Sequence, residues 1–96
     1  MVPGIETMGM RDDAERQRFE LDVEGQVVFA DYERRPGLLV IRYVYAPPAL
    51  RGTGAAGRLM GLVAAQARAE ERRILALCGY ARGWLAMSRA HRELLA

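Results

Sequence analysis

The spacing of apolar residues changes near residue 47 of this 96-residue chain, and that change limits the possible folds more than any other feature. Up to residue 46 apolar residues alternate with polar ones or run continuously, which is typical of β-strands. From residue 55 they recur every three to four positions, which is typical of an α-helix. Pro47-Pro48 separates the two parts, because proline cannot donate to the hydrogen-bond ladder of a sheet. The pattern predicts one domain in which a sheet is built first and helices follow.

Three strands are predicted before the prolines. The segments RFELDVEG and QVVFADYER each alternate apolar and polar residues, as half-buried strands do. The segment LLVIRYVYA, residues 38–46, is apolar at almost every position, so we expect it to lie inside the sheet. Short turns at Glu24-Gly25 and at Arg35-Pro36-Gly37 join the three strands into an antiparallel meander.

The second half predicts a helix, a strand and a helix. Helical spacing runs from residue 55 to about 71, an apolar strand covers residues 73–78, and a second helix covers about 81–95. A strand that follows another through a helix lies parallel to it in a right-handed crossover. The order β-β-β-α-β-α therefore predicts a mixed α/β sheet, a meander followed by a parallel βαβ unit. Residues 1–15 show no periodicity and are predicted to be a flexible tail before a domain of residues 16–96.

Several classes of protein do not fit the composition. Cys78 and His91 are single residues of their kind, which excludes a disulfide framework and a cysteine-rich metal site, so no metal is expected. No apolar run reaches the length of about 20 residues that crosses a bilayer, and no secretory signal is visible, so a cytoplasmic location is expected. A sheet this small offers an edge to a second copy; a homodimer is one expectation, and the oligomeric state stays open.

The charge is weakly basic, at +2 with a pI near 9.1, and all 14 Lys and Arg positions are arginine. A nucleic-acid-binding face would gather arginines beside aromatic side chains. Along the sequence they are scattered, so arginine-rich surface helices are the simpler interpretation. A small basic nucleic-acid-binding domain remains an alternative, and a nucleic-acid partner is not expected.

The loop RGTGAAGR, residues 51–58, matches three phosphate-binding patterns. Its glycines spell GxGxxG, but a dinucleotide site needs an acidic residue about 20 positions further on, and the strand there ends in Cys78. The loop also approaches the nucleotide P-loop, yet Arg58-Leu59 stands where lysine and a hydroxyl residue are required. The third pattern, R-x-x-G-x-A, cradles coenzyme A and fits a loop that follows a strand and opens a helix.

The physical basis of that third interpretation is the start of the helix. Its first N–H groups have no intrahelical acceptor and carry roughly +0.5 of an elementary charge from the helix dipole. Glycines let a diphosphate come close to the backbone, and Arg51 adds a charged donor at the mouth. The residues predicted to bind a diphosphate here are Arg51, Gly52, Thr53, Gly54, Ala55 and Ala56.

Residues 17 to about 85 resemble the GNAT acetyltransferase superfamily, in particular its small single-domain branch. The resemblance is carried by RFELDVEGQVVFADYERRPG, by APPALRGTGAAGRLM, and by the strand ending ALC with the following helix that contains Trp84. It implies acetyl-CoA as the cofactor, with pantetheine between the strands that hold Tyr45 and Leu77. It also implies a bulge in the central strand, near Tyr45 and Ala46, whose free N–H would bind the thioester oxygen.

The acceptor half of the chain departs from the branch it resembles. Tyr43 stands where the branch usually has a histidine, Gly79 where it has a proline, and Ser88-Arg89 where it has a His-Pro pair. Cys78, by resemblance, lies beside the acetyl group as an acetyl carrier or an acid, or it is only a buried small side chain. Tyr80, Tyr45 or Tyr43 could protonate the leaving thiolate, with Tyr80 preferred. His91 is expected on the solvated surface and Trp84 in the core.

The sequence thus predicts an N-acetyltransferase that moves an acetyl group from acetyl-CoA to a primary amine by direct attack. A protein lysine, a polyamine and a small metabolite are all open as acceptors. The first alternative is a non-catalytic CoA-binding or regulatory module, favoured by the missing histidines. The second is the nucleic-acid-binding domain described above.

Overall fold

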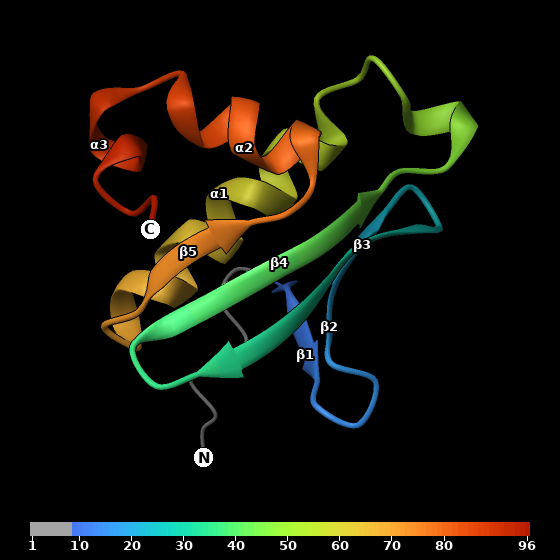
Figure 1. Ribbon diagram of the computed structural model, residues 1–96. Helices are drawn as coiled ribbons and strands as arrows, with labels where there is room; N and C mark the ends of the chain where they lie inside the picture. The colour runs from blue at the N-terminus through green and yellow to red at the C-terminus, as the bar shows by residue number, and fades with distance from the viewer. Residues whose placement is uncertain (1–8) are drawn as a thin grey trace.

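A five-stranded sheet with helices on one face makes up the structure (Figure 1). The computed structural model describes residues 9–96. Strands lie in the order β1-β2-β3-β4-β5, antiparallel except for the parallel pair β4 and β5. This confirms the predicted mixed α/β class. The elements are β1 (Arg11–Asp13), β2 (Arg18–Val23), β3 (Gln26–Arg35), β4 (Leu38–Tyr45), the 3-10 helix η2 (Pro48–Leu50), α1 (Ala55–Ala69), β5 (Arg73–Ala76), α2 (Gly79–Ala86) and α3 (Arg89–Arg92).

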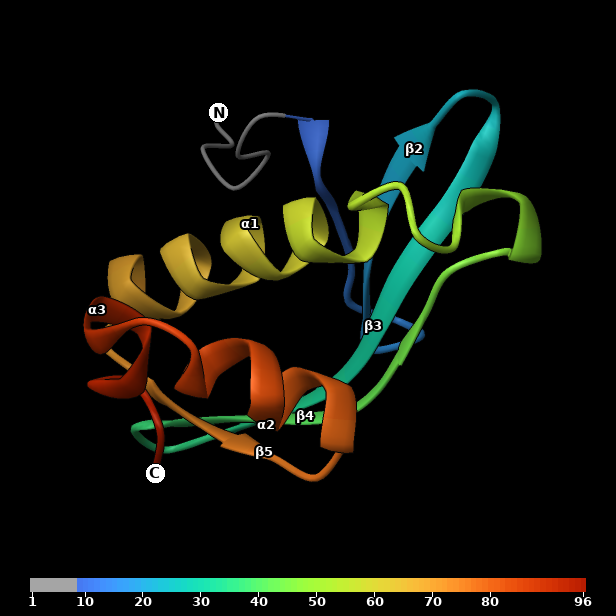
Figure 2. The same cartoon turned by 90° about the horizontal axis from the view of Figure 1, so that it is seen from above.

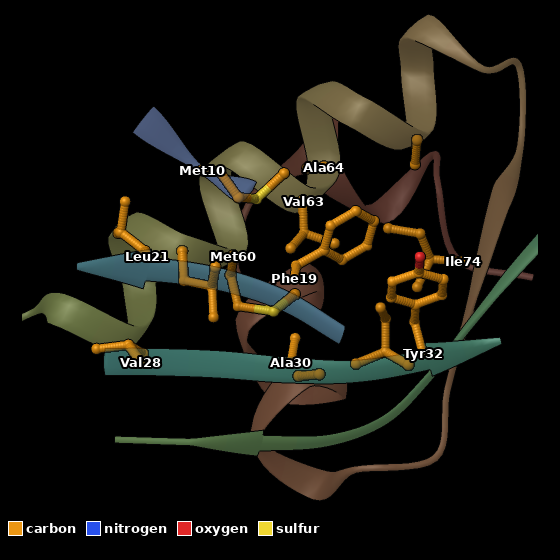
Figure 3. Close-up of a cluster of buried hydrophobic side chains, with 14 of the residues drawn as sticks. Met10, Phe19, Leu21, Val28, Ala30, Tyr32, Met60, Val63, Ala64 and Ile74 are labelled. Atoms are coloured by element: carbon orange, nitrogen blue, oxygen red, sulfur yellow. The ribbon is translucent and has the colours of Figure 1, made fainter. Parts of the chain in front are cut away.

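The helices α1 and α2 cover the same face of the sheet (Figure 2). Phe19 on β2 and Tyr32 on β3 stack with ring centroids 4.3 Å apart, and both are buried. Figure 3 shows these strand residues meeting Met60 and Val63 of α1. Because side chains alternate along a strand, the neighbours of the buried residues point to the opposite face, which no helix among residues 9–96 covers. Within the part of the chain described, no helix has the length and apolarity needed to cross a bilayer.

The structure differs from the flexible tail predicted over residues 1–15. Met10 is fully buried in the core, and residues 11–13 form β1, which pairs antiparallel with β2. The strand has no apolar alternation because its charged side chains make ion pairs instead, as Arg11 does with Glu20 at 3.0 Å and with Asp22 at 2.6 Å. The part of that prediction on residues 1–8 lies outside the described residues.

The second predicted helix is also different, because it is broken. The segment expected as one helix over about 81–95 forms α2 and α3, separated at Ser88. The Ser88 hydroxyl accepts a hydrogen bond from the backbone N–H of His91 at 3.2 Å and so begins α3 as its N-cap. After α3 the chain runs beside β5, where Ile74 donates to the Leu94 carbonyl at 2.6 Å and accepts from the Ala96 N–H at 2.8 Å.

An ionic cluster ties the edge of the sheet to the end of α1. Arg34 on β3 contacts Asp12 of β1 at 2.8 Å and Glu70, just after α1, at 2.6 Å. Glu70 also contacts Arg72 at 2.7 Å. The hydrogen bond from Arg34 is the largest of the effects that lower the pKa of Glu70 to about 2, and it outweighs partial burial, which raises that pKa.

We expect this cluster to make stability depend on pH in the acid range. Glu70 has a lower pKa in the folded state than in the unfolded chain, so its contribution is present above pH about 4.5 and is lost as the pH falls toward 2. After allowance for solvent screening, the loss is on the order of 1–2 kcal/mol. Urea unfolding should show Glu70→Gln less stable than the unmodified chain at pH 7, with the gap closing near pH 2. A gap that is constant with pH would contradict this role for Glu70.

Candidate functional site

The loop between β4 and α1 encloses a pocket of about 450 Å³. It lies at the carboxyl end of β4, against the first turn of α1 and the beginning of α2. Its walls are partly apolar, from side chains of the sheet and of η2, and partly exposed backbone from the glycine loop. The lining residues are Val44, Ala46, Leu50, Arg51, Gly52, Gly54, Ala55, Ala56, Gly57 and Tyr80.

The backbone of the loop presents unpaired N–H groups to this pocket. Gly54 is the N-cap of α1 with φ of 88°, a left-handed conformation that other residues adopt only with strain. The first hydrogen bond of the helix runs from the Arg58 N–H to the Gly54 carbonyl at 3.0 Å. The N–H groups of Ala56 and Gly57 therefore have no backbone acceptor within residues 9–96, and that of Ala55 has only the Thr53 hydroxyl at 3.3 Å. The positive end of α1 faces the pocket.

Hydrogen bonds from the side chains of the loop to its own backbone fix its conformation. The Thr53 hydroxyl donates to the Leu50 carbonyl at 2.5 Å, which closes the turn after η2. Arg51 donates from Nε to the Ala46 carbonyl at 3.0 Å, and its guanidinium lies 5.7 Å from the ring centroid of Tyr45. The terminal nitrogens of Arg51 make no hydrogen bond to the described residues, so a charged donor remains available at the rim of the pocket.

A gap opens between β4 and β5 beside the pocket. The parallel pairing ends with Ile41, whose carbonyl accepts from the Leu77 N–H at 2.9 Å, whereas β4 continues to Tyr45. The register between β3 and β4 shifts at the same level, because Ile41 pairs with Tyr32 but Tyr43 pairs with Asp31. Arg42 is thus the extra residue of a β-bulge. The resemblance implied a bulge near Tyr45 and Ala46; the structure places it at Arg42, where β4 leaves its parallel neighbour.

Six of the eight residues predicted to bind the cofactor line the pocket, and two do not. Tyr45 and Thr53 do not line the pocket, since the Tyr45 ring stacks on Phe29 at 5.2 Å on the face away from the helices and the Thr53 hydroxyl is used within the loop. The other six predicted residues line it: Ala46, Arg51, Gly52, Gly54, Ala55 and Ala56. Sequence reasoning missed Val44, Leu50 and Gly57, although Gly57 was visible as the third glycine of the GxGxxG pattern.

Gly57 allows α1 and α2 to approach each other closely. A Cβ atom at this position would lie 3.3 Å from the indole nitrogen of Trp84 and 3.8 Å from the hydroxyl of Tyr80. The Tyr80 hydroxyl is therefore held over the first turn of α1, at the pocket wall. The pKa of Tyr80 is raised, first by partial burial and then by the nearby Cys78.

The remaining predicted residues lie outside the pocket lining. Cys78 occupies the N-cap position of α2 and packs partly buried against the core. Tyr43 is 50% exposed on the face away from the helices. His91 is half-buried rather than fully solvated, because it stacks on Trp84 with ring centroids 4.4 Å apart and its Nδ1 lies 2.9 Å from the Ser88 hydroxyl.

The geometry suits a ligand with an anionic end joined to an apolar chain. The anionic end matches the free N–H groups of α1 and Arg51, and the apolar part matches Val44, Ala46 and Leu50. Within residues 9–96 no three His, Cys, Asp or Glu side chains gather as a metal site would require.

A comparison with protein families supplies independent information. The family model described as GCN5-related N-acetyl-transferase matches residues 18–94, from the start of β2 to the end of the chain's last turn. A search of curated proteins finds no match.

Proposed function

Because the chain belongs to the GCN5-related N-acetyltransferase family, we propose that it transfers an acetyl group from acetyl-CoA to a primary amine. The proposal is supported above all by the pocket at the start of α1. There, backbone N–H groups without acceptors and the Arg51 guanidinium lie beside the apolar side chains of Val44, Ala46 and Leu50.

The residues of the pocket fit the parts of acetyl-CoA in order. The diphosphate would be bound by the backbone of residues 52–56 with Arg51 as a charged donor. The pantetheine arm would lie along Val44 and Ala46, which places the thioester toward the gap beside Arg42. The lining contains one cation, Arg51, and no carboxylate, so no negative side chain of the lining would repel the diphosphate.

The reaction forms a bond between the amine nitrogen and the acetyl carbon and breaks the carbon–sulfur bond. The leaving thiolate takes a proton, which we assign to Tyr80 because it lines the pocket, and the amine loses one to water. A free lysine amine with a pKa near 10.4 is only about one-thousandth neutral at pH 7.4, which costs roughly 4 kcal/mol. Holding the amine against the thioester offsets much of the barrier as proximity. A role for Cys78 stays a prediction.

The role of Tyr80 gives a specific expectation. Tyr80→Phe removes the phenolic proton and keeps the ring that covers the pocket. We expect kcat to fall on the order of 10- to 100-fold, as for the loss of one general acid, while the KM for acetyl-CoA changes less than about threefold. Steady-state thiol release measures both constants. Met87→Leu, at the exposed end of α2 and outside both pockets, is the control and should leave kcat unchanged. Equal kcat values in all three proteins would exclude Tyr80 as the acid.

Transferase activity itself is tested by mixing the protein with acetyl-CoA and a panel of amines and following release of the CoA thiol. We expect release above the hydrolytic background with at least one acceptor, and mass spectrometry should show that acceptor about 42 Da heavier, because an acetyl group replaces one hydrogen. Binding of acetyl-CoA without release on any acceptor would contradict the transferase and favour a CoA-binding module.

A further inference from the structure

The open face of the sheet carries a second pocket, distinct from the one at the start of α1. It is a depression of about 290 Å³ across β2, β3 and the bulge of β4. Three of its residues are arginines, against one carboxylate. The lining consists of Arg16, Gln17, Arg18, Asp31, Tyr32 and Arg42.

The charges in this depression leave a positive excess. Arg18 donates from Nε to Asp31 at 2.7 Å, so the single carboxylate of the lining is already paired. The Arg16 side chain is 70% exposed, and its Nε lies 3.7 Å from the carboxylate of Asp13, a long ion pair. Arg42 is exposed and makes no hydrogen bond or ion pair with the described residues; it has a weak Coulombic effect on Glu33, whose own ion pair is with Arg35. One guanidinium is therefore free and a second is weakly held.

Aromatic rings adjoin the arginines on the same face. Phe29 stacks on Tyr45 at 5.2 Å and lies 6.3 Å from Tyr43, and the Arg18 guanidinium covers Phe29 at 3.7 Å. Tyr43, next to Arg42, is half exposed. The surface thus offers flat apolar contact area beside free cationic donors, a combination suited to a chain with acidic side chains.

The depression is close to the place where acetyl transfer would occur, but on the opposite face of β4. Arg42 lines the arginine depression and Val44 lines the pocket of α1, two residues further along the same strand. Two residues of a strand span only about 7 Å. Beyond Ile41 no strand pairs with that edge of β4 among the described residues, so a molecule on the open face would approach the thioester past this unpaired edge.

We propose that the arginine depression binds the carboxylates of the acetyl acceptor, so that the acceptor is an acidic amine and neither a polyamine nor a lysine in a basic segment. The inference rests on the proposed acetyl transfer and adds the substrate class. An amine with a carboxylate nearby places its negative charge on Arg42 and Arg16 and its amine at the gap. A polyamine or a basic peptide meets like charges at the same place, which is unfavourable.

The first test compares acceptors of opposite charge. Two peptides of equal length carry one lysine each, flanked by glutamates in one and by arginines in the other, and free glutamate and spermine serve as small counterparts. We expect kcat/KM for the acidic peptide to exceed that for the basic peptide by at least tenfold, with the difference shrinking as salt is added. Glutamate acetylated as well as the acidic peptide identifies a small acid as the source, and a preference for the peptide identifies a protein segment. A higher rate with spermine or the basic peptide overturns the proposal.

The second test uses Arg42→Gln, with Arg89→Gln as the control on the exposed side of α3. For the acidic peptide we expect Arg42→Gln to raise KM about fivefold with kcat nearly unchanged, and Arg89→Gln to change neither. A readout without catalysis is the shift of the Arg42 and Tyr43 amide resonances when the acidic peptide is added alone. If those resonances move but no acceptor releases thiol, the acetyl transfer fails and the carboxylate site stands. If they do not move, or if single-stranded DNA shifts them and the peptide does not, the carboxylate site is wrong.

Discussion

Replacing Ala56 with glutamate should weaken binding of acetyl-CoA by more than about 100-fold without unfolding the protein. Ala56 is the second residue of α1 and lines the pocket, so a carboxylate there would stand where the diphosphate is proposed to bind. Two unit charges about 5 Å apart repel each other by about 3 kcal/mol at an effective dielectric constant near 20. The same carboxylate is favourable for the helix itself, by about 0.3–1 kcal/mol, because it faces the positive end of the dipole. Calorimetric titration measures the affinity and thermal unfolding measures the stability.

The matched control for this variant is Ala56→Gln, which has the same size and no charge. It should lose far less affinity than Ala56→Glu, so that the difference between the two reports charge alone. Pantetheine, which lacks the diphosphate, should bind both variants equally. If acetyl-CoA binds Ala56→Glu and Ala56→Gln alike while both are folded, the diphosphate does not lie at the start of α1.

Replacing Phe19 with alanine should cause the largest loss of stability, about 3–5 kcal/mol. The side chain is completely buried between the sheet and α1, and its ring lies 4.3 Å from that of Tyr32 and 5.6 Å from the Arg34 guanidinium. Its removal leaves a cavity and exposes the ionic cluster of Arg34 to water. In a domain of about 100 residues this loss lowers the melting temperature by roughly 15–30 °C. Chemical denaturation and thermal unfolding both measure it.

The control is Phe29→Ala, which removes the same ring from the open face of the sheet. Phe29 is only partly buried, so the loss should be about 1 kcal/mol. Equal losses of stability at the two positions would contradict a core that lies only on the helix-covered face of the sheet.

The strands β2 and β3 were predictable because each has one face against a single layer of helices. Alternation then shows directly in the sequence, as in β2, where Phe19, Leu21 and Val23 are buried and the residues between them are not. The start of α1 was predictable for a different reason. A left-handed glycine is required where the loop enters the helix, and that requirement is visible as a residue type.

Three features of the fold could not be predicted from local patterns. β1 is held by ion pairs to a strand that follows it, and charged residues carry no periodicity. The break between α2 and α3 depends on the Ser88 cap, which the continuing apolar spacing conceals. The bulge at Arg42 arises from the mismatch between two strands, so no single stretch of sequence encodes it.

The pocket at the start of α1 could be predicted in part from the sequence, whereas the arginine depression could not. The glycine loop and Tyr80 line the same pocket, and their residue types indicate the chemistry they can perform. The arginines looked scattered because Arg16, Arg18 and Arg42 are gathered only when β2, β3 and β4 pair. Their proximity to Phe29 and Tyr43 follows from the same pairing, and sequence distance conceals it.

The residues that follow α3 limit how the sheet can grow. Both backbone groups of Ile74 are already bonded to Leu94 and Ala96, so β5 has its outer position filled from within the same molecule. Among the described residues this leaves the β1 side as a border to which a neighbouring strand can add, since the other unpaired stretch, β4 beyond Ile41, faces the gap where the thioester is proposed to lie. When each molecule has one free edge, two molecules that pair through it leave no edge for a third. Association through the sheet would therefore stop at a pair instead of continuing into a fibre.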